Sequence, residues 1–227
     1  MGLRVLGVNA SSRTDGWTAE LLDEVLKAAA EKGALTERLD LVRHPFPFCA
    51  GNYSHDPGLC GPEVCLQGPW DGFGHIAERL SWADAVVFAT PVYWFSLSAR
   101  MKALLERMTS LENQGIWNLG KPMALVAVAE EDGAAQALSQ MLLPLSYMGF
   151  VLAPMGLVYT HRRGRKTLAD DPEAIPDAKR AGWNLVEMAE RLKGAEFKAP
   201  APPLQVDGLH RAAPLEAQPT RTRSARH

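Results

Sequence analysis

The chain has 227 residues, of which 47% are hydrophobic and 22% charged, as in an ordinary globular protein. A formal net charge of −2 excludes the strongly basic surface of a protein that binds nucleic acid by electrostatics. With no apolar run near the roughly 20 residues of a membrane helix, no signal peptide and only three cysteines, the sequence predicts a cytoplasmic protein.

Short apolar runs alternate with amphipathic segments along the chain. The apolar runs predict β-strands at residues 3–8, 35–41, 84–90, 122–129 and 150–159. Apolar residues at helical spacing predict helices around residues 21–29, 73–80, 97–108, 138–145 and 185–192. Because strand alternates with helix, we predict an α/β fold: a doubly wound, five-stranded parallel sheet with helices on both faces.

The first strand leads into a polar stretch at residues 9–18, NASSRTDGWT, just before a helical pattern. Ligands bind at the carboxyl ends of parallel strands, and a helix N-terminus attracts anions. The stretch contains small or hydrogen-bonding residues that suit a phosphate monoester: Ser11, Ser12, Arg13, Thr14, Gly16 and Thr18. The alternative is an ordinary helix start capped by Asp15 or Thr18. Neither a P-loop motif nor G-x-G-x-x-G is present.

Two segments interrupt the alternation. Residues 43–70 hold prolines, glycines and all three cysteines. Such a long irregular excursion in a compact domain is usually functional. Residues 199–227 are proline-rich and lack apolar periodicity, which predicts a disordered tail after a domain of residues 1–198.

The loop after the third strand carries aromatic residues. We expect Pro91 to halt this strand, with Tyr93 and Trp94 at its carboxyl end and Ser96 or Ser98 capping the next helix. The two aromatic side chains could stack a flat ring opposite the first loop. Alternatively, they pack under a loop.

These two loops resemble the motifs of one family. ASSRTDGWT (residues 10–18) resembles G-S-x-R-x-x-G-x-T, and TPVYWFSLSARMKALLER (residues 90–107) resembles [ST]-P-x-Y-x-x-x-x-[ST]-x-x-[ML]-K-x-x-x-[DE]-R. Both motifs are those of the NAD(P)H-dependent FMN reductases of the flavodoxin-like superfold, near its iron–sulfur flavoprotein branch. The resemblance extends over about residues 1–193 and implies the strand order 2-1-3-4-5.

The resemblance implies that FMN lies across three loops. The first loop would enclose its phosphate, at Ser11, Ser12, Arg13, Gly16, Trp17 and Thr18. The second would line its ribityl chain and ring, at Pro91, Val92, Tyr93 and Trp94. The third would contribute Ala129, Glu130, Glu131, Asp132 and Gly133, where the family often has a Thr-Gly-Gly-like run. Three acids in this loop would disfavour an anionic reduced flavin nearby.

The cysteines also depart from the family's pattern. Iron–sulfur flavoproteins carry a compact motif beginning C-x-x-C-x-x-C, whereas Cys60 and Cys65 follow Cys49 at wider spacing. A [4Fe–4S] cluster normally takes four thiolates, so His44 or His55 would have to complete the set. We expect buried thiols or a relic of the cluster motif, and no bound metal. The alternative is zinc on the cysteines and a histidine.

The basic run HRRGRK at residues 161–166 follows the fifth strand. We interpret it as a solvated loop, and the alternative is attraction of the phosphates of NADPH.

The resemblance implies an enzyme that uses FMN to pass two electrons from NADPH or NADH to a quinone, a flavin or a similar small acceptor. No catalytic side chain is expected, because the flavin carries the chemistry. The alternatives are a non-enzymatic FMN electron carrier, an iron–sulfur flavoprotein and a flavin-free interaction module of the same superfold. The resemblance also implies a homodimer or homotetramer, with no nucleic-acid or membrane partner.

Overall fold

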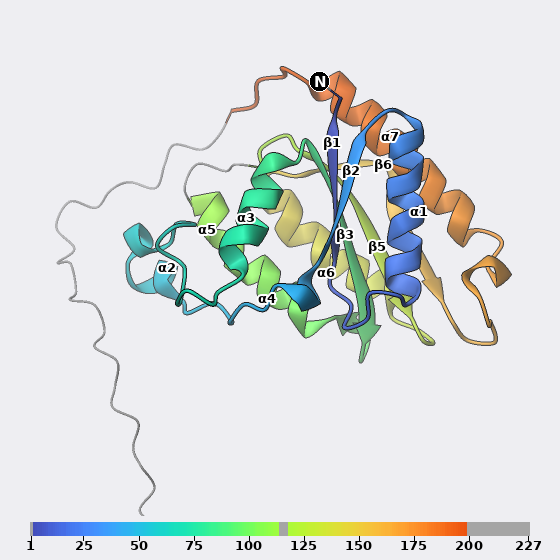
Figure 1. Cartoon of the computed structure of the whole chain (residues 1–227), viewed down its shortest axis with the longest axis horizontal. Helices are drawn as coiled ribbons and strands as arrows, with labels where there is room; N and C mark the ends of the chain where they lie inside the picture. The colour runs from blue at the N-terminus through green and yellow to red at the C-terminus, as the bar shows by residue number, and fades with distance from the viewer. Residues whose placement is uncertain (1, 114–117, 199–227) are drawn as a thin grey trace, which may run out of the picture.

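The computed structural model describes residues 2–113 and 118–198 (Figure 1). Its sheet has five parallel strands: β1 (Arg4–Asn9), β2 (Leu35–Asp40), β3 (Ala85–Tyr93), β5 (Pro122–Ala129) and β6 (Val151–His161). They lie in the order β2-β1-β3-β5-β6, which confirms the predicted 2-1-3-4-5 arrangement. A two-residue strand, β4 (Ser96–Leu97), pairs antiparallel with the end of β3 and was not predicted.

Helices cover both faces of the sheet (Figure 1). Helices α1 (Trp17–Glu31) and α7 (Ala174–Leu192) pack on one face, and α3 (Phe73–Trp82), α4 (Ala99–Arg107) and α6 (Ala134–Tyr147) pack on the other. All five predicted helices are therefore confirmed. The shorter helices are η1 (Leu41–Arg43), α2 (Asn52–His55), η2 (Pro57–Leu59), α5 (Thr109–Asn113) and η3 (Leu168–Asp170).

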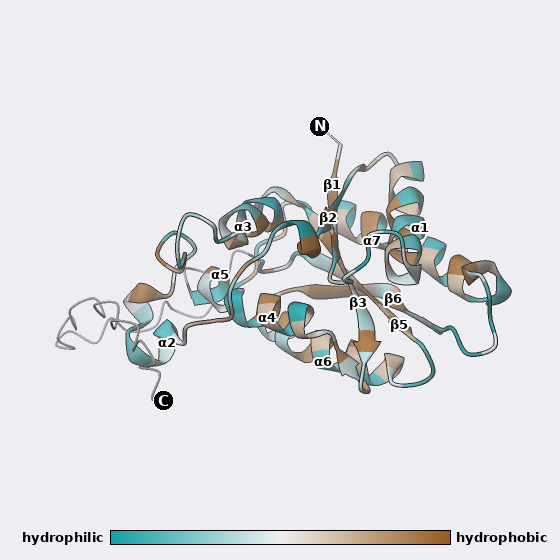
Figure 2. Cartoon of the chain, turned by 60° about the horizontal axis from the view of Figure 1, so that its bottom comes forward, coloured by the Kyte–Doolittle hydropathy of each residue, from teal (hydrophilic) through white to brown (hydrophobic). Residues whose placement is uncertain are grey.

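Successive side chains of each central strand pack into two hydrophobic cores, one on each face of the sheet. Val5 packs with α1 and α7, whereas its neighbour Leu6 packs with the helices of the other face. All eight residues of β5 are buried, so this strand is apolar throughout. Figure 2 shows largely apolar strands in the middle, between helices in which hydrophilic and hydrophobic residues are mixed. The edge strand β2 is less buried: its first residue is exposed and the next three are partly buried.

Pro91 does not end β3. Pairing with β1 stops at Ala89, but β5 still pairs with Pro91, and β4 pairs with Val92 and Tyr93. A proline has no N–H to donate, so it is tolerated where one flank of a strand has lost its partner. The expectation that Pro91 halts the strand was therefore wrong.

The excursion of residues 43–70 contains only η1's last residue, α2 and η2 as regular structure. The predicted tail, residues 199–227, lies outside the described residues, so the tail and the domain boundary at residue 198 stay predictions. Within residues 2–113 and 118–198, no helix combines the length and hydropathy that crossing a membrane requires.

Candidate functional site

The loop after β1 is folded around the buried Asn9. The Asn9 Nδ2 donates to Asp40 Oδ1 at 2.8 Å, and the Asn9 Oδ1 accepts from the backbone N–H of Ser11 at 3.0 Å. The Ser11 Oγ in turn accepts from the backbone N–H of Arg13 at 3.1 Å. These hydrogen bonds stabilise the turn that the loop makes around Asn9.

A side chain of β2, Arg38, also stabilises this loop. Arg38 donates to the carbonyl oxygen of Thr14 at 3.0 Å and pairs with Asp40 and Asp23. Neither Asn9 nor Arg38 was predicted from the sequence. Asn9 could have been found as the polar residue that directly follows the apolar run of its strand, and Arg38 from its i, i+2 spacing to Asp40 on an adjacent edge strand.

Helix α1 begins without a capping side chain. Its N-cap residue is Gly16, so neither Asp15 nor Thr18 caps it, and that alternative was wrong. By contrast, Ser98 caps α4, since its Oγ accepts from the N–H of Met101 at 3.2 Å, as predicted. The first backbone N–H groups of α1 and the positive end of its dipole are therefore left for an anion.

Arg13 lies over this helix start. A Cβ built on Gly16 would be 3.4 Å from the Arg13 Nε and 3.7 Å from its Cζ. Ser12 and Arg13 are exposed, whereas Ser11 and Thr18 are buried. The arrangement offers backbone donors, hydroxyls and one guanidinium, a donor set that suits a phosphate group.

The second loop is a tight hairpin that presents aromatic side chains. Trp94 (φ 50°) and Phe95 (φ 60°) both adopt left-handed backbone conformations between the paired residues Tyr93 and Ser96. Such conformations strain bulky residues by about 1–3 kcal/mol each. Trp94 is 94% exposed, so the alternative that it packs under a loop was wrong.

The second loop contacts both of its neighbours. The Ser98 Oγ donates to the carbonyl oxygen of Ala10 at 3.3 Å, and Arg100 Nη1 donates to the Ser12 Oγ at 3.3 Å. On the other side, a Cβ at Gly133 (φ 94°) would lie 2.7 Å from the Cα of Phe95. Only glycine fits there. The three predicted loops therefore meet at the carboxyl edge of the sheet.

Ion pairs offset the acids of the third loop. Arg162 Nη1 lies 3.3 Å from Glu130 Oε2, and Arg163 Nη2 lies 2.7 Å from Glu131 Oε2 and 3.5 Å from Asp132 Oδ2. The guanidinium of Arg162 also lies 5.2 Å from the centre of the Trp17 ring, in the first loop. The basic run interpreted as a solvated loop thus ties the first and third loops together and balances their charge.

The excursion is anchored by Arg107, the last residue of the second motif. Its side chain is fully buried and pairs with Asp71 at 2.8 Å. Arg107 also donates to the carbonyl oxygens of Pro47 and Cys65, each at 3.1 Å, and lies 4.4 Å from the centre of the Phe73 ring. The excursion is therefore fixed to α4, which begins at the candidate site.

Asp71 is held in its charged form. Burial alone would raise the pKa of this carboxyl group. Hydrogen bonds from Arg107 and from the backbone N–H groups of Gln67 and Phe73 outweigh burial, so the pKa is lowered from its ordinary value.

The three cysteines gather in the excursion. Cys60 and Cys65 are buried and Cys49 is partly exposed. Burial raises the pKa of Cys60 to about 11, and the neighbouring thiols of Cys65 and Cys49 add to this effect. Within the described ranges, no three His, Cys, Asp or Glu side chains are arranged to hold a metal ion. The expected absence of a metal stays a prediction.

Comparison with protein families identifies the family of this chain. The model of the family described as NADPH-dependent FMN reductase matches residues 3–163. An iron–sulfur flavoprotein of Methanocaldococcus jannaschii is 32% identical over 110 residues, or 48% of this chain and 53% of the relative. The chain thus matches about half the length of this relative and of one from Archaeoglobus fulgidus (27% identical). A second M. jannaschii iron–sulfur flavoprotein is 22% identical over 85% of this chain and 100% of its own length.

Solved structures share the fold. RosB with a bound 8-demethyl-8-formylriboflavin-5'-phosphate is similar over 99% of this chain and 100% of its own, with a TM-score of 0.70 and 16% identity. The NAD(P)H:quinone oxidoreductase from Methanothermobacter marburgensis is similar over 82% and 100%, with a TM-score of 0.58 and 18% identity. An archaeal flavodoxin is similar over 83% and 99%, with a TM-score of 0.53 and 14% identity. The fold is therefore flavodoxin-like.

Proposed function

Because this chain belongs to the family of NADPH-dependent FMN reductases, we propose that it binds FMN across its three loops and passes two electrons from NADPH or NADH to a small acceptor. A quinone or a flavin is the acceptor class that fits a planar, stacking site. The observation that carries the proposal is the uncapped start of α1, which meets the other two loops at one edge of the sheet.

The first loop would hold the phosphate of FMN. Ser11 keeps the loop curled, the backbone N–H groups after Gly16 point out of the helix start, and Arg13 lies above it. Ser12, Trp17 and Thr18 complete the enclosure. Because the phosphate is charged, each hydrogen bond to it is worth about 1.5–3 kcal/mol.

The second and third loops would hold the ring. Pro91 and Val92 form the floor at the end of β3, and the hairpin presents Tyr93 and Trp94 beside it. On the other side, Ala129, Glu130 and Gly133 offer mainly backbone groups. When bound, FMN supplies the two-electron chemistry. The pairing of Glu130, Glu131 and Asp132 with arginines reduces the charge that these acids would impose on the ring.

The test is steady-state kinetics with the full chain loaded with FMN. In the proposed site, protein covers one face of the FMN ring, so NADPH and a planar acceptor must bind in turn to the other face. Double-reciprocal plots of NADPH against a quinone should therefore give parallel lines. Intersecting lines would instead require two separate sites. Protein that holds FMN but does not oxidise NADPH or NADH would be an electron carrier.

A second candidate is an iron–sulfur flavoprotein. It is favoured by the gathering of Cys49, Cys60 and Cys65 in the excursion and by the names of the curated relatives. We expect no cluster, because three thiols are one fewer than a [4Fe–4S] cluster normally takes. Stoichiometric iron and acid-labile sulfide in anaerobically purified protein would favour this second candidate.

A further inference from the structure

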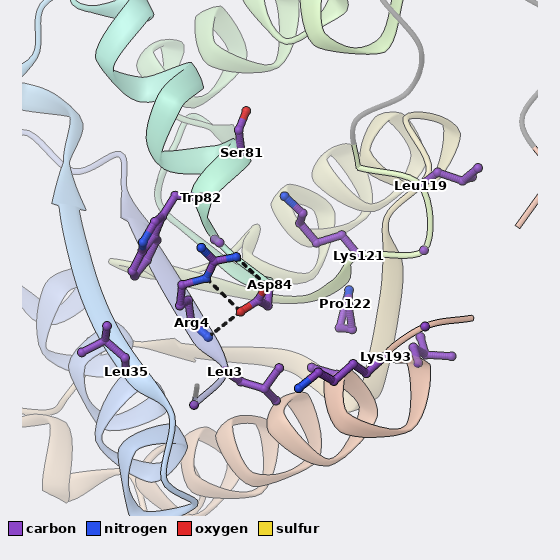
Figure 3. Close-up of a pocket in the computed structure, with 16 residues that line it drawn as sticks. Leu3, Arg4, Leu35, Ser81, Trp82, Asp84, Leu119, Lys121, Pro122 and Lys193 are labelled. Carbon is purple, nitrogen blue, oxygen red and sulfur yellow. Dashed lines mark hydrogen bonds and ion pairs between the residues drawn. The ribbon is translucent and has the colours of Figure 1, made fainter. Parts of the chain in front are cut away.

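A cavity of about 760 Å³ lies at the amino edge of the sheet, opposite the three loops (Figure 3). It is formed by the starts of β1, β2 and β5 and by the ends of α3 and α7. Its apolar wall consists of Leu3, Leu35, Trp82, Leu119, Pro122 and Leu192. The volume is that of a small-molecule site, and neither the family's motifs nor the proposed FMN site uses it.

One amine is fixed at this cavity. The Lys121 Nζ donates to the carbonyl oxygen of Leu80 at 2.6 Å, at the end of α3. Within the described residues, Lys121 forms no ion pair. The carboxylate of the neighbouring Asp84 is bound by the side chain and the backbone N–H of Arg4. Figure 3 shows this Arg4–Asp84 pair beside the Lys121 side chain.

The surroundings favour the neutral form of this amine. Burial lowers the pKa of Lys121 to about 8; Asp84 opposes the shift and Arg4 adds to it. A neutral lysine amine is a nucleophile, whereas an ammonium ion is not.

A second lysine lines the same cavity. Lys193, at the end of α7, lines it and has no ion-pair partner among residues 2–113 and 118–198. When the Lys121 amine is neutral, Arg4 and Lys193 against Asp84 still leave an excess of one positive charge at the cavity. A reagent that carries a reactive carbonyl and a negative leaving group matches this pattern.

We propose that Lys121 is a site of acylation by small acyl phosphates. The amine nitrogen attacks the carbonyl carbon, the new C–N bond forms, and the C–O bond to phosphate breaks. The phosphate leaves with the electron pair of that bond and takes up the proton that the nitrogen loses. The resulting amide keeps one N–H, which can still donate to the carbonyl oxygen of Leu80.

The test is acetylation of the full-length protein by acetyl phosphate at pH 7.5, followed by mass spectrometry of its peptides. Lys121 should be acetylated about tenfold faster than the exposed Lys32, because a much larger fraction of its amine is neutral. The rate at Lys121 should rise with pH through about 8, and its advantage should vanish in urea. Equal rates at Lys121 and Lys32 in the folded protein would overturn the proposal.

A matched pair of reagents tests the recognition of phosphate. Lys193→Met should slow the acetylation of Lys121 by acetyl phosphate several-fold, but not its acetylation by an uncharged N-hydroxysuccinimide ester. Equal slowing with both reagents, or with neither, would overturn the assignment of acyl phosphates as the donor class. The readout does not involve FMN, so it is independent of the proposed oxidoreductase activity.

Discussion

The side chain of Arg13 lies over the first turn of α1, where Gly16 leaves the backbone N–H groups open. We predict that Arg13→Ala weakens FMN binding by about 1.5–3 kcal/mol, since it removes a hydrogen bond to a charged group. Fluorescence titration with FMN measures this change. Thermal stability should stay the same, because Arg13 is exposed.

The matched control for Arg13 is Lys32→Ala. Lys32 is also an exposed cation, but it lies at the other end of the same helix. It should leave the FMN affinity unchanged. If both variants bound FMN like the original chain, the first loop would not be the phosphate site.

Helix α4 is joined to the excursion by the fully buried pair of Arg107 and Asp71. We predict that Asp71→Asn lowers the free energy of unfolding at pH 7 by about 3–5 kcal/mol, because it leaves a buried guanidinium without its partner. The pKa of Asp71 is lower in the folded chain than in the unfolded one, so its stabilisation is full above the unfolded pKa. It is lost as the pH falls through the folded value.

Urea unfolding at pH 7 and in acid measures both effects. The difference between the original chain and Asp71→Asn should shrink as the pH is lowered. On the same helix, Glu106→Gln breaks only the exposed pair with Lys102, and should cost about 0.3–0.5 kcal/mol. A similar small loss for Asp71→Asn would show that the excursion is not held by this pair.

The elements differ in how far the sequence predicts them. Apolar periodicity identified all five parallel strands and their helices, because the spacing of apolar residues along the sequence reflects which faces of an element are buried. The second motif located the loop after β3, and Ser98 was found as a cap. The hairpin was missed, because Trp94 and Phe95 are not residues that usually adopt left-handed turns.

Contacts between distant loops were not predictable either. The pairing of Glu130 with Arg162 joins residues 32 positions apart, on loops whose approach depends on the register of β5 and β6. The hydrogen bond from Arg38 to the carbonyl oxygen of Thr14 likewise depends on β2 lying beside β1. Such pairs follow from the assembled sheet, and no local pattern encodes them.

On the scale of the whole molecule, apolar side chains are exposed beside the candidate site. Trp94 is 94%, Leu143 76% and Tyr147 83% exposed. Between the hairpin, α4 and α6 lies a groove of about 1020 Å³ whose lining includes Leu97, Leu105 and Met148. A projecting apolar tip and an apolar groove on one face suit an isologous pair of chains.

We therefore predict a homodimer, the smaller of the two assemblies that the family resemblance implies. Leu143→Glu should shift the chain towards the monomer in sedimentation velocity experiments, since it places a charge in the groove. Leu35→Glu changes an equally apolar residue at the opposite edge of the sheet and should leave the assembly intact. A monomer before any substitution would contradict the prediction.

Strand β5 connects the two edges of the sheet at which we place chemistry. It starts beside Lys121, ends at Ala129 before the third loop, and spans about 26 Å at 3.3 Å per residue. Each residue of β5 is buried, and the strand is paired on both sides. It therefore has no alternative conformation that could couple a change at one end to the other end. The coupling free energy between acylation of Lys121 and occupancy of the flavin site is therefore expected to be close to zero. One chain would then respond to two conditions independently. The flavin site at one edge would respond to the supply of reducing power, and Lys121 at the other edge would respond to the supply of activated acyl groups.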